Sequence, residues 1–520
     1  MVRDNDGSIQ QSLYLASSLL FALLIVSKIY TARRVIWRLQ KANLPMPQHS
    51  IFTGHLLLLK KHMERLPPDC TINTPLREIA QQFPRGMGYF DLWPFTKPIL
   101  FVINTFGASQ VEKQLFDKPS EVRSAFWVLT GGPNLFGMPQ DQWKFWRPIF
   151  NPGFSASHML ELVPTIVRET EVFCQALRAK ARSGEMIQLE NLTIRLTIDV
   201  IAATVMETRL HHQTTENRFA ASLRRQIEWT EFGTALNPIT RYNFFRPLVL
   251  WYNAPSITHQ SPLYLTLANY MKEKDVTPAH EVDQVFKEIA AAQLRLFLVA
   301  GHDTTSSVLI YCYHLLSAHP EALARARSEI ESVLGPDTDQ AASTIQQLPS
   351  LMNKLPYLTA VMKEALRLFP PASGFREGKP GVSITDENGT AYPTDNCYVW
   401  VVHLALHRDP KYFKDPDSFL PERWLVEPED PLYPPKGAWR PFEFGPQNCI
   451  GQSLAIMEIK VVLALTVREF TIRPAYDEWD RMHQKIGIRK VNGNRAYQVE
   501  GGGGGAHPSD RYPCRVVANV

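Results

Sequence analysis

The fold of this chain is decided by residues 441–451, which read Pro441-Phe442-Glu443-Phe444-Gly445-Pro446-Gln447-Asn448-Cys449-Ile450-Gly451. Phenylalanine, glycine, cysteine and a second glycine follow the pattern F-x-x-G-x-x-x-C-x-G, which chance produces in about one such chain in a thousand. Glycines on both sides of one cysteine allow a tight turn whose backbone amides point at the sulfur. A helix starting near Ile450 would add the positive end of its dipole, and both effects favour the thiolate.

A hydrogen-bonded thiolate in an apolar setting has the properties of an axial ligand of haem iron. The alternative is a buried cysteine that only fills a glycine turn. The cysteines lie at 70, 174, 312, 397, 449 and 514, and no two of them form a Cys-x-x-Cys pair. This spacing fits neither a zinc ribbon nor a dense disulfide scaffold, and it indicates a reduced, cytosol-facing protein in which any reactive cysteine acts alone.

The composition indicates a globular protein with a large buried core. Of the 520 residues, 45% are hydrophobic and 20% are charged, which excludes global disorder. The 55 lysines and arginines against 51 aspartates and glutamates give a net charge of +4. That balance excludes a general nucleic-acid binder, so we expect no nucleic-acid partner.

An apolar segment near the N-terminus predicts a membrane anchor. Leu13–Ser27 carries no charge, and its extension to Ala32 covers 20 residues, about 30 Å of helix, which is enough to span a bilayer. The flank that follows is basic, which should keep the rest of the chain in the cytosol; its charged residues are Lys28, Arg33, Arg34, Arg38 and Lys41. A cleaved signal peptide and an amphipathic helix lying on the bilayer are the alternatives.

Hydrophobic periodicity predicts a mainly α fold with small β-sheets. The helical period is clearest over Met159–Arg182, Glu190–Met206, Gln284–Ala318, Glu321–Leu334, Leu358–Leu368 and Gln452–Arg468. Strand-like runs are few and short, at Ile99–Val102, Cys397–Val402 and Phe470–Arg473. Residues 409–439 are dense in proline, aspartate and aromatics, and a long irregular stretch of this kind normally serves a function.

The 441–451 segment resembles the haem-ligand loop of the cytochrome P450 family. Four more marks of the family occur in its order: W-x-x-x-R at Trp143 and Arg147, the oxygen-activation motif over Ala300–Thr305, E-x-x-R over Glu364–Arg367, and P-E-R-F/W over Pro421–Trp424. Each motif is weak alone, but together they are decisive. The resemblance is to membrane-bound, eukaryotic microsomal members, most of all to filamentous-fungal ones of secondary metabolism. It implies a cytochrome P450 fold preceded by a single N-terminal transmembrane helix.

The resemblance also implies a set of haem-binding residues. Haem b would be ligated by the thiolate of Cys449 and contacted by Trp143, Arg147, Arg376 and Gln447. Gln447 departs from the family, which usually has an arginine there, and glutamine lacks the charged fork that holds a propionate. We therefore expect weaker haem retention unless the other contacts compensate. Glu364, Arg367 and Arg423 are implied to form a buried network that locks the stretch carrying the cysteine.

The oxygen-activation motif interrupts an almost wholly apolar helix. Gly301, beside side chains that compete for backbone hydrogen bonds, should loosen this helix and make room for dioxygen. Asp303 and Thr304, the implied catalytic pair, can relay protons as the O–O bond breaks, although a buried helix with a capped kink is the alternative. His302 is expected to face away from the haem. Stretches that line substrate pockets in the family contain Phe126, Trp127, Phe297, Ala300 and Ser373.

The function that the resemblance implies is that of a haem-thiolate monooxygenase. Residues 1–40 would be the membrane anchor with its basic flank, and residues 41–520 a cytosolic catalytic domain at the endoplasmic reticulum. The domain would hydroxylate, epoxidise or desaturate a hydrophobic small molecule, with electrons from NADPH-cytochrome P450 reductase docked on a basic face near Cys449. Two alternatives stay open: a P450-fold isomerase or dehydratase acting without dioxygen, and a non-catalytic haem protein.

Overall fold

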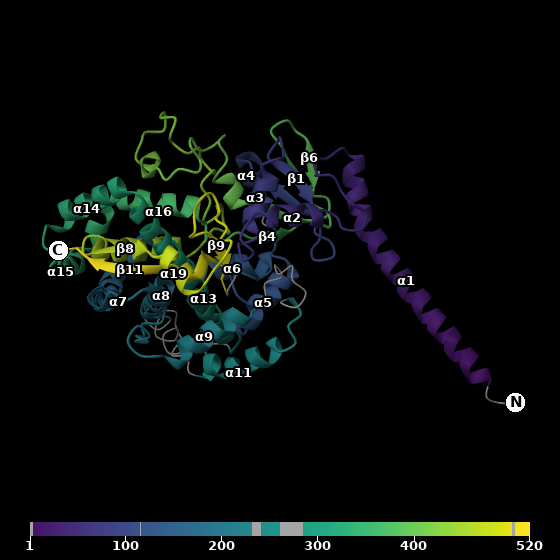
Figure 1. The fold of residues 1–520 in the computed structure, drawn as a ribbon, viewed down its shortest axis with the longest axis horizontal. Coiled ribbons are helices and arrows are strands. Elements are labelled where there is room, and N and C mark those ends of the chain that lie inside the picture. Colours follow the sequence, from purple (N-terminus) through teal and green to yellow (C-terminus); the bar gives the residue numbers. More distant parts are fainter. Residues whose placement is uncertain (1–3, 115, 231–240, 260–283, 502–504, 520) are drawn as a thin grey trace.

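The computed structural model describes residues 4–114, 116–230, 241–259, 284–501 and 505–519 (Figure 1). Its α-helices are α1 (Asp4–Lys41), α2 (Leu56–Met63), α3 (Asn73–Ala80), α4 (Thr105–Gln114), α5 (Ser120–Thr130), α6 (Gln140–Phe150), α7 (Ala156–Ser183), α8 (Leu189–Val205), α9 (Arg218–Trp229), α11 (Arg246–His259), α13 (Gln284–Ala318), α14 (Pro320–Leu334), α15 (Ala341–Gln347), α16 (Pro356–Leu368), α17 (His403–Leu406), α18 (Gln452–Thr466) and α19 (Tyr476–Met482). Short 3₁₀ helices are η1 (Asn151–Phe154), η2 (Pro349–Lys354), η3 (Pro421–Trp424) and η4 (Ser509–Arg511).

The strands are short, as the sequence predicts. They are β1 (Met87–Phe90), β2 (Ile99–Val102), β3 (Ile187–Gln188), β4 (Phe375–Glu377), β5 (Ser383–Thr385), β6 (Ala391–Pro393), β7 (Tyr398–Val401), β8 (Phe470–Pro474), β9 (Gln498–Glu500), β10 (Ala506–Pro508) and β11 (Pro513–Ala518). The predicted mainly α fold with small sheets is therefore confirmed, and the predicted helices and strands agree with the observed ones to within a few residues. The irregular stretch 409–439 contains only the short helix η3 in this structure.

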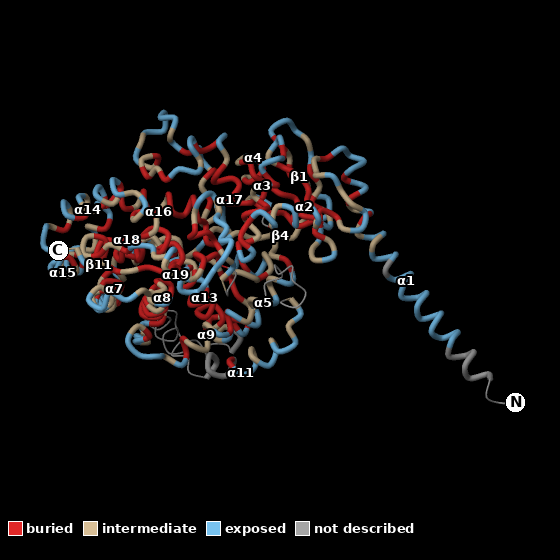
Figure 2. Tube along the Cα trace, in the orientation of Figure 1, coloured by how far each residue is buried: buried red, intermediate tan, exposed pale blue. Residues whose placement is uncertain are grey.

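The helical core is built around α13. This helix packs along α8 and also contacts α16 and α18. The apolar side chains buried between these helices form one large core cluster, and burial of that surface drives their association (Figure 2). Gly301 has a packing role that the sequence reading did not foresee. A Cβ at this position would lie 2.8 Å from Ile201 Cδ1, so the close approach of α13 to α8 requires glycine there.

The largest sheet has the strand order β1-β2-β7-β4. β2 pairs antiparallel to β1 and parallel to β7, with Ile99 opposite Tyr398 and Val102 opposite Val401. All residues of β2 and β7 are buried, which explains their unbroken apolar sequence. A second sheet, β3-β11-β8, closes the opposite side of the molecule. β4 ends beside the central cavity and carries Arg376 to it.

α1 projects from the globular body (Figure 1). Among the described residues, Gln11–Lys41 is the one segment long and apolar enough to cross a membrane, and an 18-residue window within it has a mean hydropathy of 1.9. The end of α1 is different, because Ile36 and Leu39 are buried against the domain and Arg33 forms an ion pair with Asp91. The last turns of the helix are thus packed into the body, although the sequence placed all of 1–40 in a separate anchor.

Candidate active site

A cavity of about 680 Å³ lies between α13 and the 441–451 segment, which is called the ligand loop below. Ala300, Gly301 and Thr304 of α13 line one side, and Phe442 and Cys449 of the ligand loop line the other. Ala300 is exposed although it sits in the middle of a core helix, because its side chain borders this open space. The cavity therefore has an apolar roof, a sulfur-bearing floor and room for a flat ligand between them.

The ligand loop presents the Cys449 sulfur to the cavity. The Cys449 amide donates to the Phe442 carbonyl over 2.8 Å, and α18 begins at Gln452, close to the predicted start. Burial raises the pKa of the Cys449 thiol, while the amides of Gly451 and Gln452 and the charge of Arg147 oppose that rise. The predicted amide contacts are present, yet burial outweighs them, so the loop alone does not favour the thiolate. A coordinated cation at the sulfur would reverse that balance. Cys449 lies deep in the protein and is still accessible, since its side chain faces the cavity.

Three cations reach the cavity and end on neutral groups. Arg147 donates to the carbonyl and side-chain oxygens of Asn448, each over 3.0 Å, and its guanidinium lies 5.8 Å from the ring of Trp143. Arg376 donates to Gln447 Oε1 over 2.9 Å. Lys118 places its ammonium 4.4 Å from the ring centre of Phe136, and burial with the nearby charge of Arg376 holds its pKa well below the usual value. Arg147, Arg376 and Lys118 are called the open cations below.

Lys118 was not singled out from the sequence. It precedes α5 in a segment without a recognisable motif, and only the fold brings it beside Arg376. The three open cations form no ion pair within the described part of the chain, and they face a cavity. Such a set is suited to a ligand that carries its own carboxylates.

A saturated charge network lies beneath the ligand loop. The Glu364 carboxylate accepts two bonds from Arg367, over 2.7 and 2.9 Å, and one from Arg423 over 3.0 Å. The indole of Trp424 and the amide of Leu420 complete its shell, at 3.0 and 3.1 Å. Arg367 also donates to the carbonyl oxygens of Pro416 and Ser418 in the irregular stretch. The side chains of Glu364, Arg367 and Arg423, called the closed network below, are fully buried.

A second group of charges ties the ligand loop to α4 and α17. Glu443 accepts from His403 over 2.8 Å and from Arg440 over 2.7 Å, and Arg440 also pairs with Glu112 over 2.5 Å. Burial raises the pKa of Glu443, but His403 and Arg440 lower it far more, so the carboxyl stays ionised. The sequence did not suggest this group, because Glu443 occupies a variable position of the ligand-loop motif and the other members His403 and Glu112 come from distant segments.

The α13 side of the cavity contains the predicted acid and alcohol. Thr304 donates its hydroxyl to the Ala300 carbonyl over 2.9 Å. α13 runs through 301–304 without a break, so the expected loosening is confined to this competition for one carbonyl. His302 points away from the cavity, as expected, with Nδ1 2.6 Å from the Leu298 carbonyl oxygen.

Asp303 has a partner that the motif did not predict. Its Oδ1 lies 3.0 Å from His507 Nε2, and Glu190 Oε2 lies 3.5 Å from His507 Nδ1. Burial lowers the pKa of His507, but Asp303 and Glu190 raise it to about 10. Burial raises the pKa of Asp303, while His507 brings it below its usual value. The imidazolium of His507 therefore lies between the carboxyl groups of Asp303 and Glu190.

The residues expected to line a substrate pocket divide in two groups. Phe126, Phe297, Ala300 and Ser373 border the cavity, whereas Trp127 is 55% exposed on the outside and does not. The Ser373 hydroxyl accepts from the Trp400 indole over 2.6 Å, so it is already engaged. Glu458 of α18 is a further cavity residue that the sequence did not suggest; burial raises its pKa well above the usual range.

Comparison with known proteins gives one consistent result. The family model for cytochrome P450 matches residues 73–261 and 257–499. The cytochrome P450 monooxygenase polC of Polytolypa hystricis is 38% identical over 97% of this chain and 96% of its own length. The cytochrome P450 monooxygenase acrF of Aspergillus aculeatus is 33% identical over 79% of this chain and 90% of its own length. Among solved structures, the cytochrome P450DA heme domain superposes with a TM-score of 0.68 at 19% identity, over 92% of this chain and 98% of that one.

Proposed function

The chain belongs to the cytochrome P450 family of haem-thiolate monooxygenases, and we propose that its central cavity holds haem b with Cys449 as the axial ligand. The observation that carries this proposal is the position of one sulfur: Cys449 lies deep in the protein, yet its side chain faces the cavity. The cavity fits the group, since a thiol stands on one side and the open cations on the rim. Thiolate-ligated haem supplies the activation of dioxygen that allows an unactivated C–H bond to be oxidised.

The open cations would hold the two haem propionates. Arg147, stacked near Trp143, and Arg376, hydrogen-bonded to Gln447, are the proposed contacts. Lys118 adds an amine that the family motif does not include, beside Arg376, and a bound propionate would raise its lowered pKa and favour its charged form. We take this as the compensation for Gln447, because the positive charge missing at 447 is supplied from another segment. The closed network would act at a distance, by fixing the ligand loop.

Thr304 and Asp303 are the proposed catalytic pair. The Thr304 hydroxyl borders the cavity and can donate or accept at bound dioxygen. Asp303 is ionised and held by His507, so it can pass a proton inward only when it turns away from that histidine. His507 would therefore control how readily the acid serves as a proton carrier.

Electrons would come from NADPH through NADPH-cytochrome P450 reductase. The sequence contains no recognisable flavin or nicotinamide site, and the family requires a redox partner. Lys144 is exposed on α6, one turn before Arg147, which in turn bonds to the ligand loop. A cation at this place would help to orient an acidic reductase surface toward Cys449.

The substrate is a hydrophobic small molecule, and we propose an intermediate of secondary metabolism that is hydroxylated, epoxidised or desaturated. Apolar cavity residues such as Phe126 and Phe297, and the two fungal monooxygenase relatives, support this class. The apolar helix α1 supports single-pass insertion in the endoplasmic reticulum membrane, with residues 1–40 as anchor and basic flank and 41–520 as cytosolic catalytic domain.

The test is turnover of the purified enzyme with reductase, NADPH and ¹⁸O₂. Candidate substrates would be the compounds that accumulate when the gene is deleted. We expect one ¹⁸O atom in a hydroxylated or epoxidised product, no product without dioxygen, and a strong red shift of the Soret peak on reduction with carbon monoxide. Cys449→Ala should abolish the shift, whereas Cys312→Ala, which removes a buried thiol distant from the cavity lining, should retain it. Product formed without dioxygen would instead identify an isomerase or dehydratase.

The proton role is tested separately with Thr304→Ala. We expect the variant to bind haem and substrate but to release hydrogen peroxide in place of product, while Thr304→Ser, which keeps the hydroxyl, restores the coupling. Equal coupling of NADPH use to product in wild type and Thr304→Ala would refute the assigned role.

A further inference from the structure

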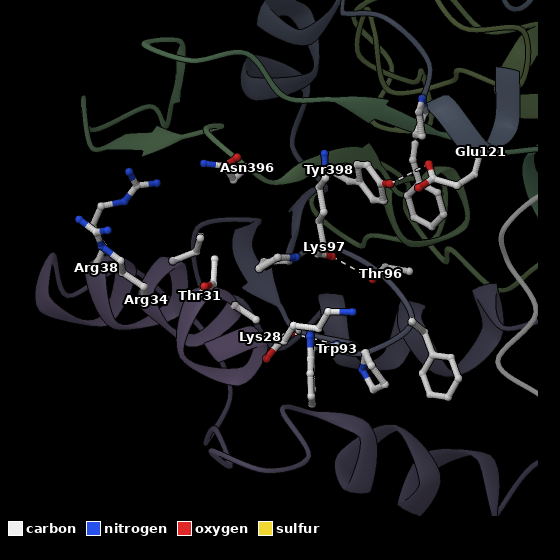
Figure 3. A pocket seen from close by; sticks show the side chains of 18 of the residues that line it. Lys28, Thr31, Arg34, Arg38, Trp93, Thr96, Lys97, Glu121, Asn396 and Tyr398 are labelled. Carbon is white, nitrogen blue, oxygen red and sulfur yellow. Dashed lines mark hydrogen bonds between the residues drawn. The ribbon is translucent and has the colours of Figure 1, made fainter. Parts of the chain in front are cut away.

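A second cavity, of about 1170 Å³, lies outside the active site between the last turns of α1 and the catalytic domain. It is called the anchor cleft below. Figure 3 shows Lys28, Arg34 and Arg38 of α1 along one side of it and Lys97 and Tyr398 on the domain side. Its volume slightly exceeds the range of about 300–1,000 Å³ that is typical of small-molecule sites. The cleft is therefore large enough for a lipid headgroup.

Positive charge dominates the lining of the anchor cleft. Among the described residues, six lysines and arginines line it against two carboxylates; the cations are Lys28, Arg34, Arg38, Lys41, Lys97 and Arg241. Both carboxylates are already engaged, since Asp91 contacts Arg33 and His49, and Glu121 accepts from Tyr398 over 3.1 Å.

The cations of α1 are only weakly engaged by the protein. Arg38 makes one long bond, 3.4 Å, to the Asp395 carbonyl, and Lys97 pairs with Glu377 at the domain side over 2.5 Å. Lys28, Arg34 and Lys41 are exposed along the same helix. The α1 side of the cleft thus concentrates positive charge that is exposed and weakly engaged, and this favours an anionic ligand.

The position of the cleft identifies the source of that ligand. The cleft begins at Ser27, where the exposed apolar part of α1 ends; Leu13 and Val26 in that part are 61% and 60% exposed. A bilayer that covers the apolar part places its headgroups at the cleft. Trp37 and Trp93 line the cleft as well, and tryptophan favours the interface between hydrocarbon and water.

We propose that the anchor cleft binds the phosphate-bearing headgroup of an anionic phospholipid from the cytosolic leaflet. Arg34 and Arg38 would bind the phosphate from the helix, and Lys97 would bind it from the domain, so that the lipid joins the anchor to the catalytic body. Guanidinium groups suit phosphate because they offer paired donors in one plane. The inference rests on the proposed membrane insertion of α1.

The experiment uses the full-length holoenzyme in phosphatidylcholine nanodiscs that contain a minor fraction of phosphatidylinositol. Native mass spectrometry after release from the nanodisc measures the fraction of protein that retains phosphatidylinositol. We expect wild type to retain one molecule in clear preference to phosphatidylcholine. Each cation removed from the cleft should lower that retention by about fivefold.

Two variants and a matched control distinguish binding of the lipid in the anchor cleft from a general effect of the protein's positive charge. The first combines Arg34→Gln, Arg38→Gln and Lys97→Gln, and the second, Thr31→Trp, fills the cleft without changing its charge. The control removes three exposed cations from elements on the side of the molecule opposite α1: Arg182→Gln, Lys354→Gln and Arg473→Gln. Loss of phosphatidylinositol in both cleft variants, with retention in the control, supports the site. Equal retention in all three, or equal loss in the control and the cleft variants, overturns it.

The source of the phosphate is tested with soluble glycerophosphoinositol at the same ionic strength. We expect it to bind far more weakly than the lipid; equally tight binding would show that the cleft takes a free phosphate ester and would overturn the lipid assignment. Alkaline carbonate extraction tests the anchor itself. Release of the protein by carbonate would refute membrane insertion and with it the lipid site, whereas the haem spectrum of the same sample shows whether the catalytic domain is intact.

Discussion

The closed network and the open cations differ in whether the protein itself supplies a counter-ion. The Glu364 carboxylate accepts from five protein donors, and both arginines around it also donate to main-chain oxygens, so the charge of Glu364 is satisfied within the chain. Arg147 and Arg376 end on neutral oxygens of Asn448 and Gln447, and both border the cavity.

This difference separates scaffold from binding site. A buried charge that is fully paired within the protein has no capacity left for a ligand, whereas a partly buried cation without a counter-ion is costly until a ligand supplies one. The position of the open cations on the rim of a cavity with a thiol at its floor matches the shape of haem, whose two carboxylates lie on one edge. The same comparison makes opposite predictions for substitutions in the two groups.

The largest effect is expected from Glu364→Gln. Loss of this carboxylate leaves the buried Arg367 and Arg423 without a counter-ion, which destabilises the fold by about 3–5 kcal/mol. Chemical denaturation of the purified protein and its haem content measure the effect. Glu422→Gln is the matched control, because Glu422 pairs with Arg325 at the surface, where the loss should be at most about 1 kcal/mol. Similar losses for the two variants would show that the network does not hold the ligand loop.

The next effect concerns His507, whose ring nitrogens lie 3.0 Å from the Asp303 carboxylate and 3.5 Å from that of Glu190. Because its pKa is raised from 6.5 to about 10, its stabilising contribution is full below pH 6.5 and is lost as the pH rises through about 10. The lowered pKa of Asp303 means that its own contribution is present above 3.8 and is lost as the pH falls further.

We therefore expect His507→Gln to lower the free energy of unfolding by about 1–3 kcal/mol at pH 7, and by less at pH 10 or above. Denaturation curves across this pH range measure the difference between wild type and variant. A difference that stays constant with pH would mean that His507 is not charged in the folded protein.

A smaller effect is expected from Arg376→Gln, and it should fall on haem retention and not on the stability of the fold. Burial lowers the pKa of Arg376, which shows that the apoprotein gains little from its charge. The apoprotein should therefore keep its stability, while haem transfer to an apomyoglobin acceptor should become about tenfold faster. Arg182→Gln, at an exposed site, should change neither quantity. If Arg376→Gln destabilised the apoprotein, Arg376 would have a structural role like that of the closed network, and the open cations would not form a separate haem-binding group.

The smallest effect is expected from Gln447→Arg, which restores the family's usual residue. A second guanidinium could bind a propionate, so haem loss should slow, but only a few-fold, because Arg376 already occupies this region 2.9 Å from Gln447 Oε1. The same transfer assay measures it. Combination with Lys118→Met should cancel the gain if Lys118 supplies the charge that Gln447 lacks.

Much of the fold could be predicted from the sequence because its signals are local. The period of α13 and the apolar runs of β2 and β7 are written in consecutive residues, and the predicted bounds of Gln284–Ala318 and Ile99–Val102 agree with the observed ones. The same holds for Cys449, since the glycines that shape its loop are its neighbours.

The site was less predictable where residues distant in sequence meet. Gly301 was attributed to a loosened helix, but its contact with Ile201 shows a packing requirement that depends on α8. The loop amides expected to favour the Cys449 thiolate do lower its pKa, but the larger opposing effect of desolvation was not predictable, because it depends on the whole surrounding protein. Phe126 and Trp127 were both placed in stretches that line the substrate pocket. Successive side chains of a helix point in different directions, so Phe126 of α5 borders the cavity and Trp127 lies on the outside.

By itself, the sequence determined the family, the helical framework and the cysteine that faces the cavity, since each depends on residues a few positions apart. Only the tertiary structure decided which charges are satisfied. His507 meets Asp303, Lys118 meets Arg376 and Lys97 faces α1 because folding brings separate segments together, and electrostatic energy depends on distance through space and on burial, neither of which is set by spacing along the chain.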